Sequence, residues 1–161
     1  IVVGGEDVFA GYWRAPELTA EVLKNGRYHT GDLARMDEEG FVYIVDRKKD
    51  MVISGGFNVY PSEVEAVLYQ HDAVQDACVF AIPDDKWGES VAAHVVLKAG
   101  RASNTTDVRS VLDAFCGERL AGFKRPRHIE FVQTLPKNPN GKVMRKAVQA
   151  PYWAGQERMV N

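Results

Sequence analysis

The chain has 161 residues, 45% of them hydrophobic, and is therefore long enough to bury a core. Its 20 Lys and Arg residues against 22 Asp and Glu residues give a net charge of −2, whereas proteins that bind nucleic acid generally show a basic excess. Every apolar run is too short to span a bilayer. We therefore expect no nucleic-acid partner and no transmembrane segment.

The cysteines and histidines do not have the spacing of a metal site. Cys78 and Cys116 lie in apolar contexts and are too far apart in sequence for a CxxC pair. Four histidines are scattered along the chain: His29, His71, His94 and His128. We predict no bound metal and, from the reduced cysteines, a cytoplasmic location.

The first part of the chain has strand and turn patterns. It opens on IVVGG without an initiator methionine, which favours a piece of a larger protein. A helix is predicted over residues 16–23, because proline is tolerated in a first helical turn and Asn-Gly follows at 25–26. Residues 41–45 are predicted to form a strand, with 51–53 as its hairpin partner.

The later part alternates helices with strands. Ser62 and Glu65 have the spacing of a capping box, which predicts a helix from residue 63 to 69 or 70. Strands are predicted at 77–82, 90–97 and 128–132. A helix is predicted to begin at residue 106, because apolar residues recur at helical spacing: Val108, Val111, Leu112 and Phe115. A final helix is predicted from residue 142 or 143 to 150.

This order of elements predicts an α+β (mixed α/β) module from about residue 49 onward, preceded by a β-rich leader. We place the domain boundary in the charged run RKKD at 47–50, where a chain can swivel without disturbing either core. The predicted domains are residues 1–48 and 49–161.

Lys142 lies in NPNGK, a Pro/Gly turn just ahead of the predicted final helix. The positive end of the helix dipole disfavours a lysine there unless an anion binds between them, and phosphate is the obvious candidate. Residues 119–146 contain eight Lys and Arg residues but one acidic residue, Glu130, so this segment suits a phosphate-rich ligand. A solvated lysine in a surface loop is the alternative.

Other residues suit a nucleotide or a narrow ligand. Asp32, in YHTGD, can accept hydrogen bonds from adjacent sugar hydroxyls, and Arg47 offers a donor fork for hydroxyl or phosphate oxygens. A turn cap and a surface salt bridge are the respective alternatives. Gly55 and Gly56 would let the backbone approach a ligand closely, or would form a tight hairpin.

Three segments, in their order and spacing, resemble the signatures of the adenylate-forming enzymes, the AMP-dependent synthetase and ligase family. They are YHTGD at 28–32, DRKKDMVISGGFNVYPSEVE at 46–65 and LPKNPNGKVMRK at 135–146. Within that family, the sequences of these segments are most similar to those of fatty-acid or other acyl-CoA synthetases. The resemblance implies a small C-terminal lid domain, with a short β-sheet flanked by helices, after a β-rich remnant of a large N-terminal domain.

The resemblance also implies roles for individual residues. Asp32 and Arg47 match the positions that hold the ribose of ATP or AMP. Lys49 matches the hinge about which the lid rotates between two half-reactions. Gly55-Gly56 matches the loop that lines the pantetheine tunnel, and Lys142 matches the lysine that bridges the substrate carboxylate and the α-phosphate during adenylation.

Two positions depart from the family pattern. Ile53 stands where coumarate ligases and luciferase carry a second lysine, so a lysine role in thioester formation is not carried over. Asn58 stands where those enzymes have glutamine, which leaves a contact to the adenylate open. A phosphate loop and an acyl pocket are absent from the sequence; the resemblance assigns both, and most of the Mg²⁺ binding, to the missing N-terminal domain.

We therefore expect the C-terminal part of an ATP-dependent acyl-CoA synthetase, with a carboxylic acid, ATP and CoA as its partners and no turnover by this part alone. The alternatives are an adenylation domain that loads a carrier protein and a non-catalytic module that binds nucleotide or CoA. Apolar leader residues are expected to pack on the missing domain or on a second copy in a homodimer: Val8, Phe9, Tyr12, Trp13 and Leu18.

Overall fold

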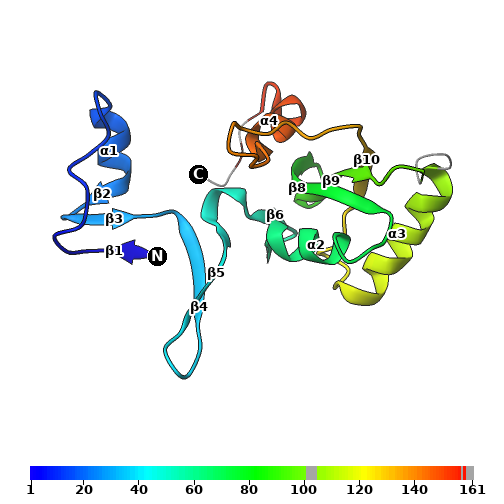
Figure 1. Ribbon diagram of the computed structural model, residues 1–161, viewed down its shortest axis with the longest axis horizontal. Helices are drawn as coiled ribbons and strands as arrows, with labels where there is room; N and C mark the ends of the chain where they lie inside the picture. The colour runs from blue at the N-terminus through cyan, green and yellow to red at the C-terminus, as the bar shows by residue number, and fades with distance from the viewer. Residues whose placement is uncertain (101–104, 157, 159–161) are drawn as a thin grey trace. The chain divides into compact units, whose positions relative to one another are not determined.

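The computed structural model describes residues 1–100, 105–156 and 158. The chain divides into two compact units, residues 1–49 and residues 50–161. In Figure 1 the first unit is coloured blue to cyan and the second runs from cyan to red.

The first unit combines one short helix with small antiparallel sheets. Helix α1 (Pro16–Val22) lies beside a sheet of order β1-β3-β2, formed by β1 (Val2–Val3), β2 (Leu23–Lys24) and β3 (Arg27–His29). A separate two-stranded ribbon follows, with β4 (Asp32–Met36) antiparallel to β5 (Val42–Arg47) (Figure 1). A short 3₁₀ turn, η1 (Lys48–Asp50), leads out of β5.

The first unit has little core of its own. All the buried hydrophobic side chains of the described chain lie in residues 52–148. In the leader, by contrast, Trp13 is 87% exposed, Met36 71% and Ile44 69%. An apolar surface of this kind marks a contact face rather than a finished domain surface.

The sequence expectations for this unit are met in part. The predicted helix at 16–23 is confirmed as α1, and the predicted strand at 41–45 is confirmed as part of β5. The predicted hairpin between 41–45 and 51–53 is wrong, because β5 pairs with β4. Asp37 closes the β4–β5 loop, since its Oδ1 accepts the N–H groups of Glu39 and Phe41 at 3.1 and 2.9 Å.

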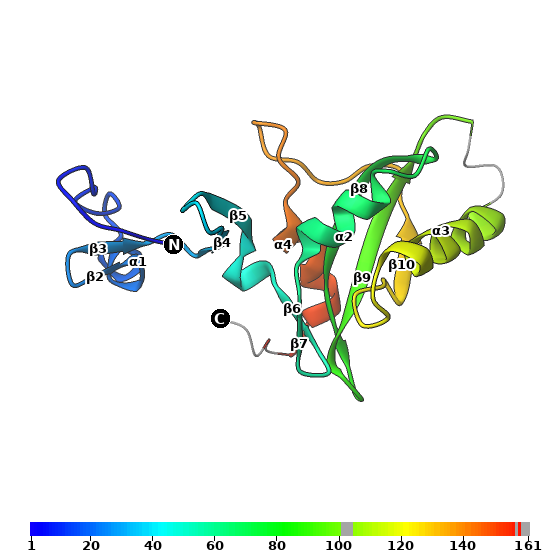
Figure 2. The ribbon, with the colours of Figure 1, turned by 90° about the horizontal axis from the view of Figure 1, so that it is seen from below.

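The second unit is built around a five-stranded sheet. Its strands are β6 (Val52–Ser54), β7 (Phe57–Val59), β8 (Val74–Asp84), β9 (Gly88–Leu97) and β10 (His128–Phe131). The order is β10-β9-β6-β7, and β8 pairs antiparallel with β9 to make the long green hairpin of Figure 2. Strand β10 runs parallel to β9.

Helices cover both faces of this sheet. They are α2 (Pro61–Leu68), α3 (Thr105–Arg119), α4 (Arg145–Gln149) and the 3₁₀ turn η2 (Ala150–Trp153). In Figure 1, α4 lies on one side of the β8–β9 hairpin and α2 and α3 on the other. The mixture of helices and sheets confirms the predicted α+β class.

Alternate side chains of β8 contribute to the two hydrophobic clusters, one on each face of the sheet. Ala77, Val79 and Ala81 join the cluster formed with α2 and α3, whereas Cys78 and Phe80 join the cluster on the α4 side. Successive side chains of a strand point to opposite faces, so one continuous apolar run can serve both. Phe80 is fully buried, and truncating such a side chain to alanine costs about 3–5 kcal/mol.

Side chains cover the edge of β8 that faces away from β9. Val79 donates its N–H to Glu65 Oε1 at 2.8 Å. The carbonyl oxygen of Ala81 accepts hydrogen bonds from Gln149 Nε2 at 3.0 Å and from Trp153 Nε1 at 2.8 Å. Helix α2 and the C-terminal segment thus satisfy main-chain groups that a further strand would otherwise pair.

The predicted strands at 77–82, 90–97 and 128–132 are confirmed, as is the helix predicted to begin at residue 106. The predicted cap at Ser62 is wrong: α2 begins at Pro61, with Tyr60 at the N-cap position and no side-chain cap. The final helix begins at Arg145, later than predicted. Within the described residues, every helix is too short or too polar to cross a membrane.

Candidate functional site

Asp32 and Arg47 form a pair in the first unit. They are opposite each other in the β4–β5 ribbon, and Arg47 Nε donates to Asp32 Oδ1 at 3.0 Å. The hydrogen bond from Arg47 holds the pKa of Asp32 below its ordinary value of 3.8, although burial acts in the other direction. The carboxylate is therefore charged at neutral pH and suited to accept hydrogen bonds from a polyol.

Lys49 lies directly after this pair, in the turn η1. Its side chain is exposed, and the turn begins where Lys48 N donates to the carbonyl oxygen of Gly31 at 2.8 Å. The main chain is thus anchored before Lys49, at the end of the ribbon. Lys49 is the last residue of the first unit, and Asp50 is the first residue of the second.

Gly55 and Gly56 form a tight two-residue hairpin turn between β6 and β7. Their φ angles are +59° and +84°, the left-handed conformation that this type of turn requires at both central residues. A Cβ on Gly55 would lie 2.6 Å from Cε3 of Trp87, whereas one on Gly56 would meet open space. Asn58 is exposed on β7.

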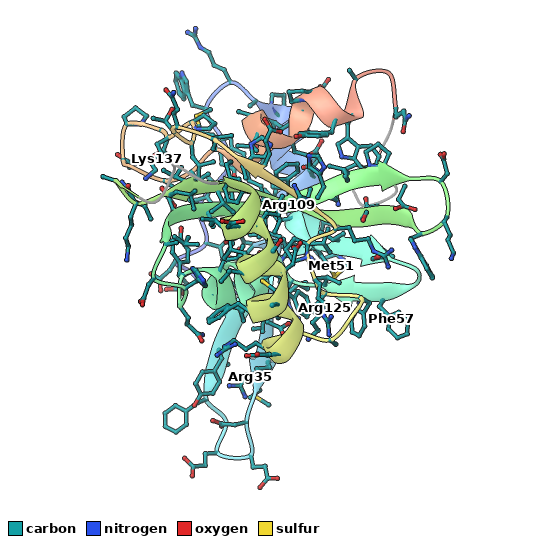
Figure 3. The ribbon with its side chains drawn as sticks, turned by 90° about the vertical axis from the view of Figure 1, so that its right-hand side faces the viewer. Arg35, Met51, Phe57, Arg109, Arg125 and Lys137 are labelled. Carbon is teal, nitrogen blue, oxygen red and sulfur yellow. The ribbon has the colours of Figure 1, made fainter. Side chains whose placement is uncertain are left out.

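Aromatic and basic side chains surround this turn. Gly55 donates its N–H to the carbonyl oxygen of Trp87 at 2.9 Å. The Lys86 ammonium and the Arg127 guanidinium lie 4.6 and 5.2 Å from the Trp87 ring centre. On the adjoining strand Phe57, which Figure 3 shows at the edge of the unit, stacks on Phe123 at 4.7 Å.

Local sequence patterns did not predict these neighbours of the glycine turn. Trp87 stands 32 residues after Gly55, and Arg127 stands a further 40 along the chain. The basic run FKRPR at 123–127 was the available sign of a phosphate-binding surface, but its position beside the turn follows from the sheet. The β6–β9 pairing at Ser54 and Gly88 brings Trp87 to the glycines.

Lys142 is exposed at the end of a closed turn. Asn138 Oδ1 accepts the N–H groups of Asn140 and Lys142 at 3.0 and 2.9 Å, and Lys137 pairs with Val143 in an antiparallel bridge. In the described part of the chain, the Lys142 amine has no hydrogen-bond or ion-pair partner. Lys142 lies on a turn ahead of the final helix, as predicted. The helix begins only at Arg145, later than predicted, so Lys142 lies outside its first turn and the dipole argument for a bound anion does not apply.

The cysteines and acidic groups do not make a metal centre. Cys78 and Cys116 are buried free thiols, and burial raises the pKa of Cys78 to about 12. Across residues 1–100, 105–156 and 158 there is no group of three or more His, Cys, Asp or Glu side chains able to hold a metal ion. The candidate functional features are the Asp32–Arg47 pair in the first unit and, in the second unit, the glycine turn and the Lys142 turn.

Comparison with known proteins identifies the family of the chain. Residues 63–142 match the AMP-binding enzyme C-terminal domain. A long-chain-fatty-acid–CoA ligase of Bacillus subtilis (strain 168) is 51% identical over 146 residues, which cover 91% of this chain. The chain belongs to the adenylate-forming enzyme family. This confirms the resemblance drawn from the three sequence segments.

Other members of the adenylate-forming family are similar over the same length. A medium/long-chain-fatty-acid–CoA ligase of Mycobacterium tuberculosis is 44% identical over 99% of this chain. Among solved structures, the o-succinylbenzoate CoA synthetase of Bacillus subtilis in complex with its acyl-adenylate intermediate has a TM-score of 0.80 and 37% identity over 91% of this chain. ATP-bound MatB of Rhodopseudomonas palustris has a TM-score of 0.79 and 39% identity over 90%.

The chain spans only part of these adenylate-forming relatives. It covers 25% of the Bacillus subtilis ligase and 28% of the Mycobacterium tuberculosis ligase. It covers 29% of the o-succinylbenzoate CoA synthetase structure. The relatives therefore carry a much larger portion besides the one seen here.

Proposed function

We propose that this chain is the C-terminal part of an ATP-dependent acyl-CoA synthetase. The reaction converts a carboxylic acid, ATP and CoA into acyl-CoA, AMP and pyrophosphate through an acyl-adenylate. The observation that carries the proposal is the exposed Lys142 amine, held at the end of a fixed turn in a chain that is 51% identical to a fatty-acid–CoA ligase. Residues 1–48 would belong with a large N-terminal domain, and residues 49–161 would form the lid.

In the first half-reaction a carboxylate oxygen attacks the α-phosphorus of ATP, and the bond from that phosphorus to the pyrophosphate oxygen breaks. Lys142 would offset the repulsion between the two anions, an effect worth about 3–4 kcal/mol in comparable electrostatic sites. Asp32 would accept hydrogen bonds from the ribose hydroxyls, with Arg47 holding its carboxylate in place. Among the described residues there is no group of three or more His, Cys, Asp or Glu side chains to hold Mg²⁺, so the N-terminal domain would supply most of the ligands of that ion.

In the second half-reaction the CoA thiol attacks the acyl carbonyl carbon and AMP leaves. The glycine turn would line the path of the pantetheine arm of CoA, since Gly56 has no Cβ and a Cβ built there would meet open space. Lys86 and Arg127, whose charged groups lie 4.6 and 5.2 Å from the centre of the Trp87 ring, would attract the phosphates of CoA. Rotation about Lys49 would exchange the Lys142 turn for the glycine turn between the two steps.

The exposed apolar side chains of the first unit support a partner for that unit. A unit in which Trp13 is 87% exposed and Met36 71% is suited to packing against the N-terminal domain of the same protein. For residues 1–161 alone we propose that these exposed apolar side chains form a homodimer contact. A cytoplasmic location fits the requirement for ATP and CoA and the reduced state of Cys78 and Cys116.

The test uses the complete protein that contains this chain. It is incubated with ATP, Mg²⁺, CoA and a panel of short, medium and long fatty acids plus an aromatic acid, and pyrophosphate and acyl-CoA are measured. Release of both with at least one acid supports the proposal. Release of neither with any acid overturns it. In a parallel reaction with a carrier protein added, acylation of the carrier protein but not of CoA assigns the carrier-loading alternative. Residues 1–161 alone should show no turnover.

A further inference from the structure

Arg145 joins three elements of the second unit. It is the first residue of α4, and its Nη1 donates to Asp50 Oδ2 at 2.9 Å while its Nη2 donates to Glu65 Oε1 at 2.7 Å. Asp50 is the first residue after the hinge candidate Lys49, and Glu65 lies on α2. One guanidinium thus links the C-terminal segment to the start of the unit and to the sheet-covering helix.

This cluster is well shielded from solvent. The side chains of Arg145, Asp50 and Glu65 are 20%, 24% and 16% exposed. Burial disfavours the charge on Arg145, but the two carboxylates outweigh it and raise the pKa of the guanidinium above its ordinary value. The planar guanidinium group can donate to two carboxylates at once, whereas the single ammonium group of a lysine does not match that geometry.

The Lys142 turn rests on this anchor. Lys142 is three residues before Arg145, and Met144 N donates to the carbonyl oxygen of Pro136 at 2.8 Å, which closes the turn at its base. On the other side of the base, Lys137 pairs with Asp76 at 2.6 Å. The Arg145–Asp50 contact thus connects the base of the Lys142 turn to residue 50.

The glycine turn has a different anchor. Glu89, which is 1% exposed, accepts the N–H of Ile53 at 2.9 Å and pairs with Arg158 at 2.9 Å. Arg158 also donates to the carbonyl oxygen of Met51 at 2.9 Å. Strand β6, which leads into the glycine turn, is thus held independently of Arg145.

We propose that Arg145 is a positioning residue which, through Asp50, holds the Lys142 turn at a fixed place relative to the hinge, so that adenylation depends on this pair more than thioester formation does. The inference rests on the proposed function, because it assigns the two turns to the two half-reactions. Arg145 acts through Lys142 and does not itself touch the reacting atoms.

The experiment compares Arg145→Lys, Asp50→Asn and the double variant in the complete protein. ATP–pyrophosphate exchange with dodecanoic acid measures adenylation, and transfer from preformed dodecanoyl-adenylate to CoA measures thioester formation. The control is Arg109→Lys, which alters another partly buried arginine, on α3, that donates to the carbonyl oxygen of Ile129 at 2.7 Å (Figure 3). Thermal unfolding of each variant is measured to identify any that fail to fold.

Both single variants are expected to lower kcat for exchange by roughly ten- to a hundredfold, the effect of a displacement of about 1 Å, with little change in the KM for ATP. Thioester formation should stay near the parent rate, and the double variant should be no worse than the worse single variant. If Arg145→Lys does not fold, Asp50→Asn carries the same test, since it removes only the charge on the hinge side.

Equal losses in both half-reactions, or additive losses in the double variant, would overturn the inference and leave the proposed function standing. An unaffected exchange rate in Asp50→Asn would do the same. A parent protein that forms neither the adenylate nor the thioester would overturn the proposed function itself. Arg109→Lys should leave the ratio of the two rates unchanged, and a shift in that ratio would also count against a specific role for Arg145.

Discussion

Arg47 and Asp32 face each other across the β4–β5 ribbon, 15 residues apart in sequence and joined by a 3.0 Å hydrogen bond from Nε to Oδ1. The side chain of Arg47 is 44% exposed and that of Asp32 is 26% exposed, so both are accessible to a ligand. Such an exposed pair contributes little to folding, but it holds a carboxylate in one orientation before any ligand arrives.

Asp32→Asn should raise the KM for ATP about tenfold, because a hydrogen bond to a charged group contributes about 1.5 kcal/mol or more. The measurement is ATP–pyrophosphate exchange at varied ATP concentration. Asp37→Asn is the matched control, since Asp37 closes the β4–β5 loop of the same ribbon through main-chain N–H groups. A KM that rises equally in both variants would point to distortion of the ribbon and not to a lost ribose contact.

The ionisation of Asp32 provides a separate test. Its pKa is depressed in the folded state by the hydrogen bond from Arg47, so the stabilisation is present above the ordinary value of 3.8 and is lost as the pH falls through the lower folded pKa. A carboxyl carbon titration by NMR should show a midpoint below 3.8. Arg47→Met should move it upward, and an unmoved midpoint would contradict the assigned cause.

Lys142→Ala should slow adenylation by roughly a hundred- to a thousandfold, the typical cost of removing one stabilising charge or donor from a reaction centre. Transfer from a preformed acyl-adenylate to CoA should be unaffected. Because the side chain is exposed, the free energy of unfolding should change by no more than about 0.5 kcal/mol. Lys146→Ala, another exposed lysine of the same segment, should leave both rates intact; equal damage from the two changes would refute the assignment.

The two glycines of the β6–β7 turn should respond differently to alanine. Gly55→Ala places a Cβ 2.6 Å from the Trp87 ring in addition to the left-handed strain, so a loss of about 2–3 kcal/mol is expected. Gly56→Ala meets open space and should lose about 1 kcal/mol from the backbone alone. Urea unfolding measures both. If Trp87→Leu does not recover part of the Gly55→Ala loss, the clash is not its cause.

His94 should make the second unit less stable in mild acid. Burial lowers the pKa of His94 below its ordinary value of 6.5, despite Glu130 at 3.3 Å; His128 and the Tyr152 hydroxyl also face the ring. The unfolded state then binds more protons than the folded state. The contribution of neutral His94 to the free energy of unfolding is therefore complete above about pH 6.5 and declines as the pH falls below that value. Urea unfolding should show this decline in the parent and a smaller one in His94→Gln.

His29→Gln provides the control for that measurement, since His29 lies on β3 in the first unit with an exposed side chain. It should retain the full decline of the parent. A decline of the same size in the parent and in His94→Gln would mean that other groups account for the acid sensitivity.

Local patterns predicted much of the second unit. The apolar spacing at Val108, Leu112 and Phe115 predicted α3, although Val111 of the same pattern is 52% exposed. Continuous apolar runs predicted β8 and β9, because these strands are buried on both faces. In β4 the pattern is weak, since its only apolar residues are Leu33, Ala34 and Met36 and none of its residues is buried. This strand was therefore missed, and β5 was given the wrong partner.

The candidate site was predictable only where its residues lie in short segments. Asp32, Arg47, Gly55-Gly56 and Lys142 were identified from family resemblance, which depends on local sequence. The contact between Arg145 and Asp50 joins residues 95 apart, and no local period encodes it. Glu65 is a second example. Its spacing from Ser62 is typical of a capping box, but its carboxylate binds the distant Arg145 and the N–H of Val79.

The C-terminal side chains that cover the unpaired edge of β8 should protect the protein from aggregation. In the described chain this strand pairs with β9 alone, and Gln149 and Trp153 occupy the carbonyl of Ala81. Removing the residues from 145 onward would leave the carbonyl of Ala81 unpaired on the outer edge of this eleven-residue strand, with Glu65 still bound to Val79. A protein shortened in this way should aggregate through strand addition, even though none of the proposed ligand contacts lies beyond Lys142.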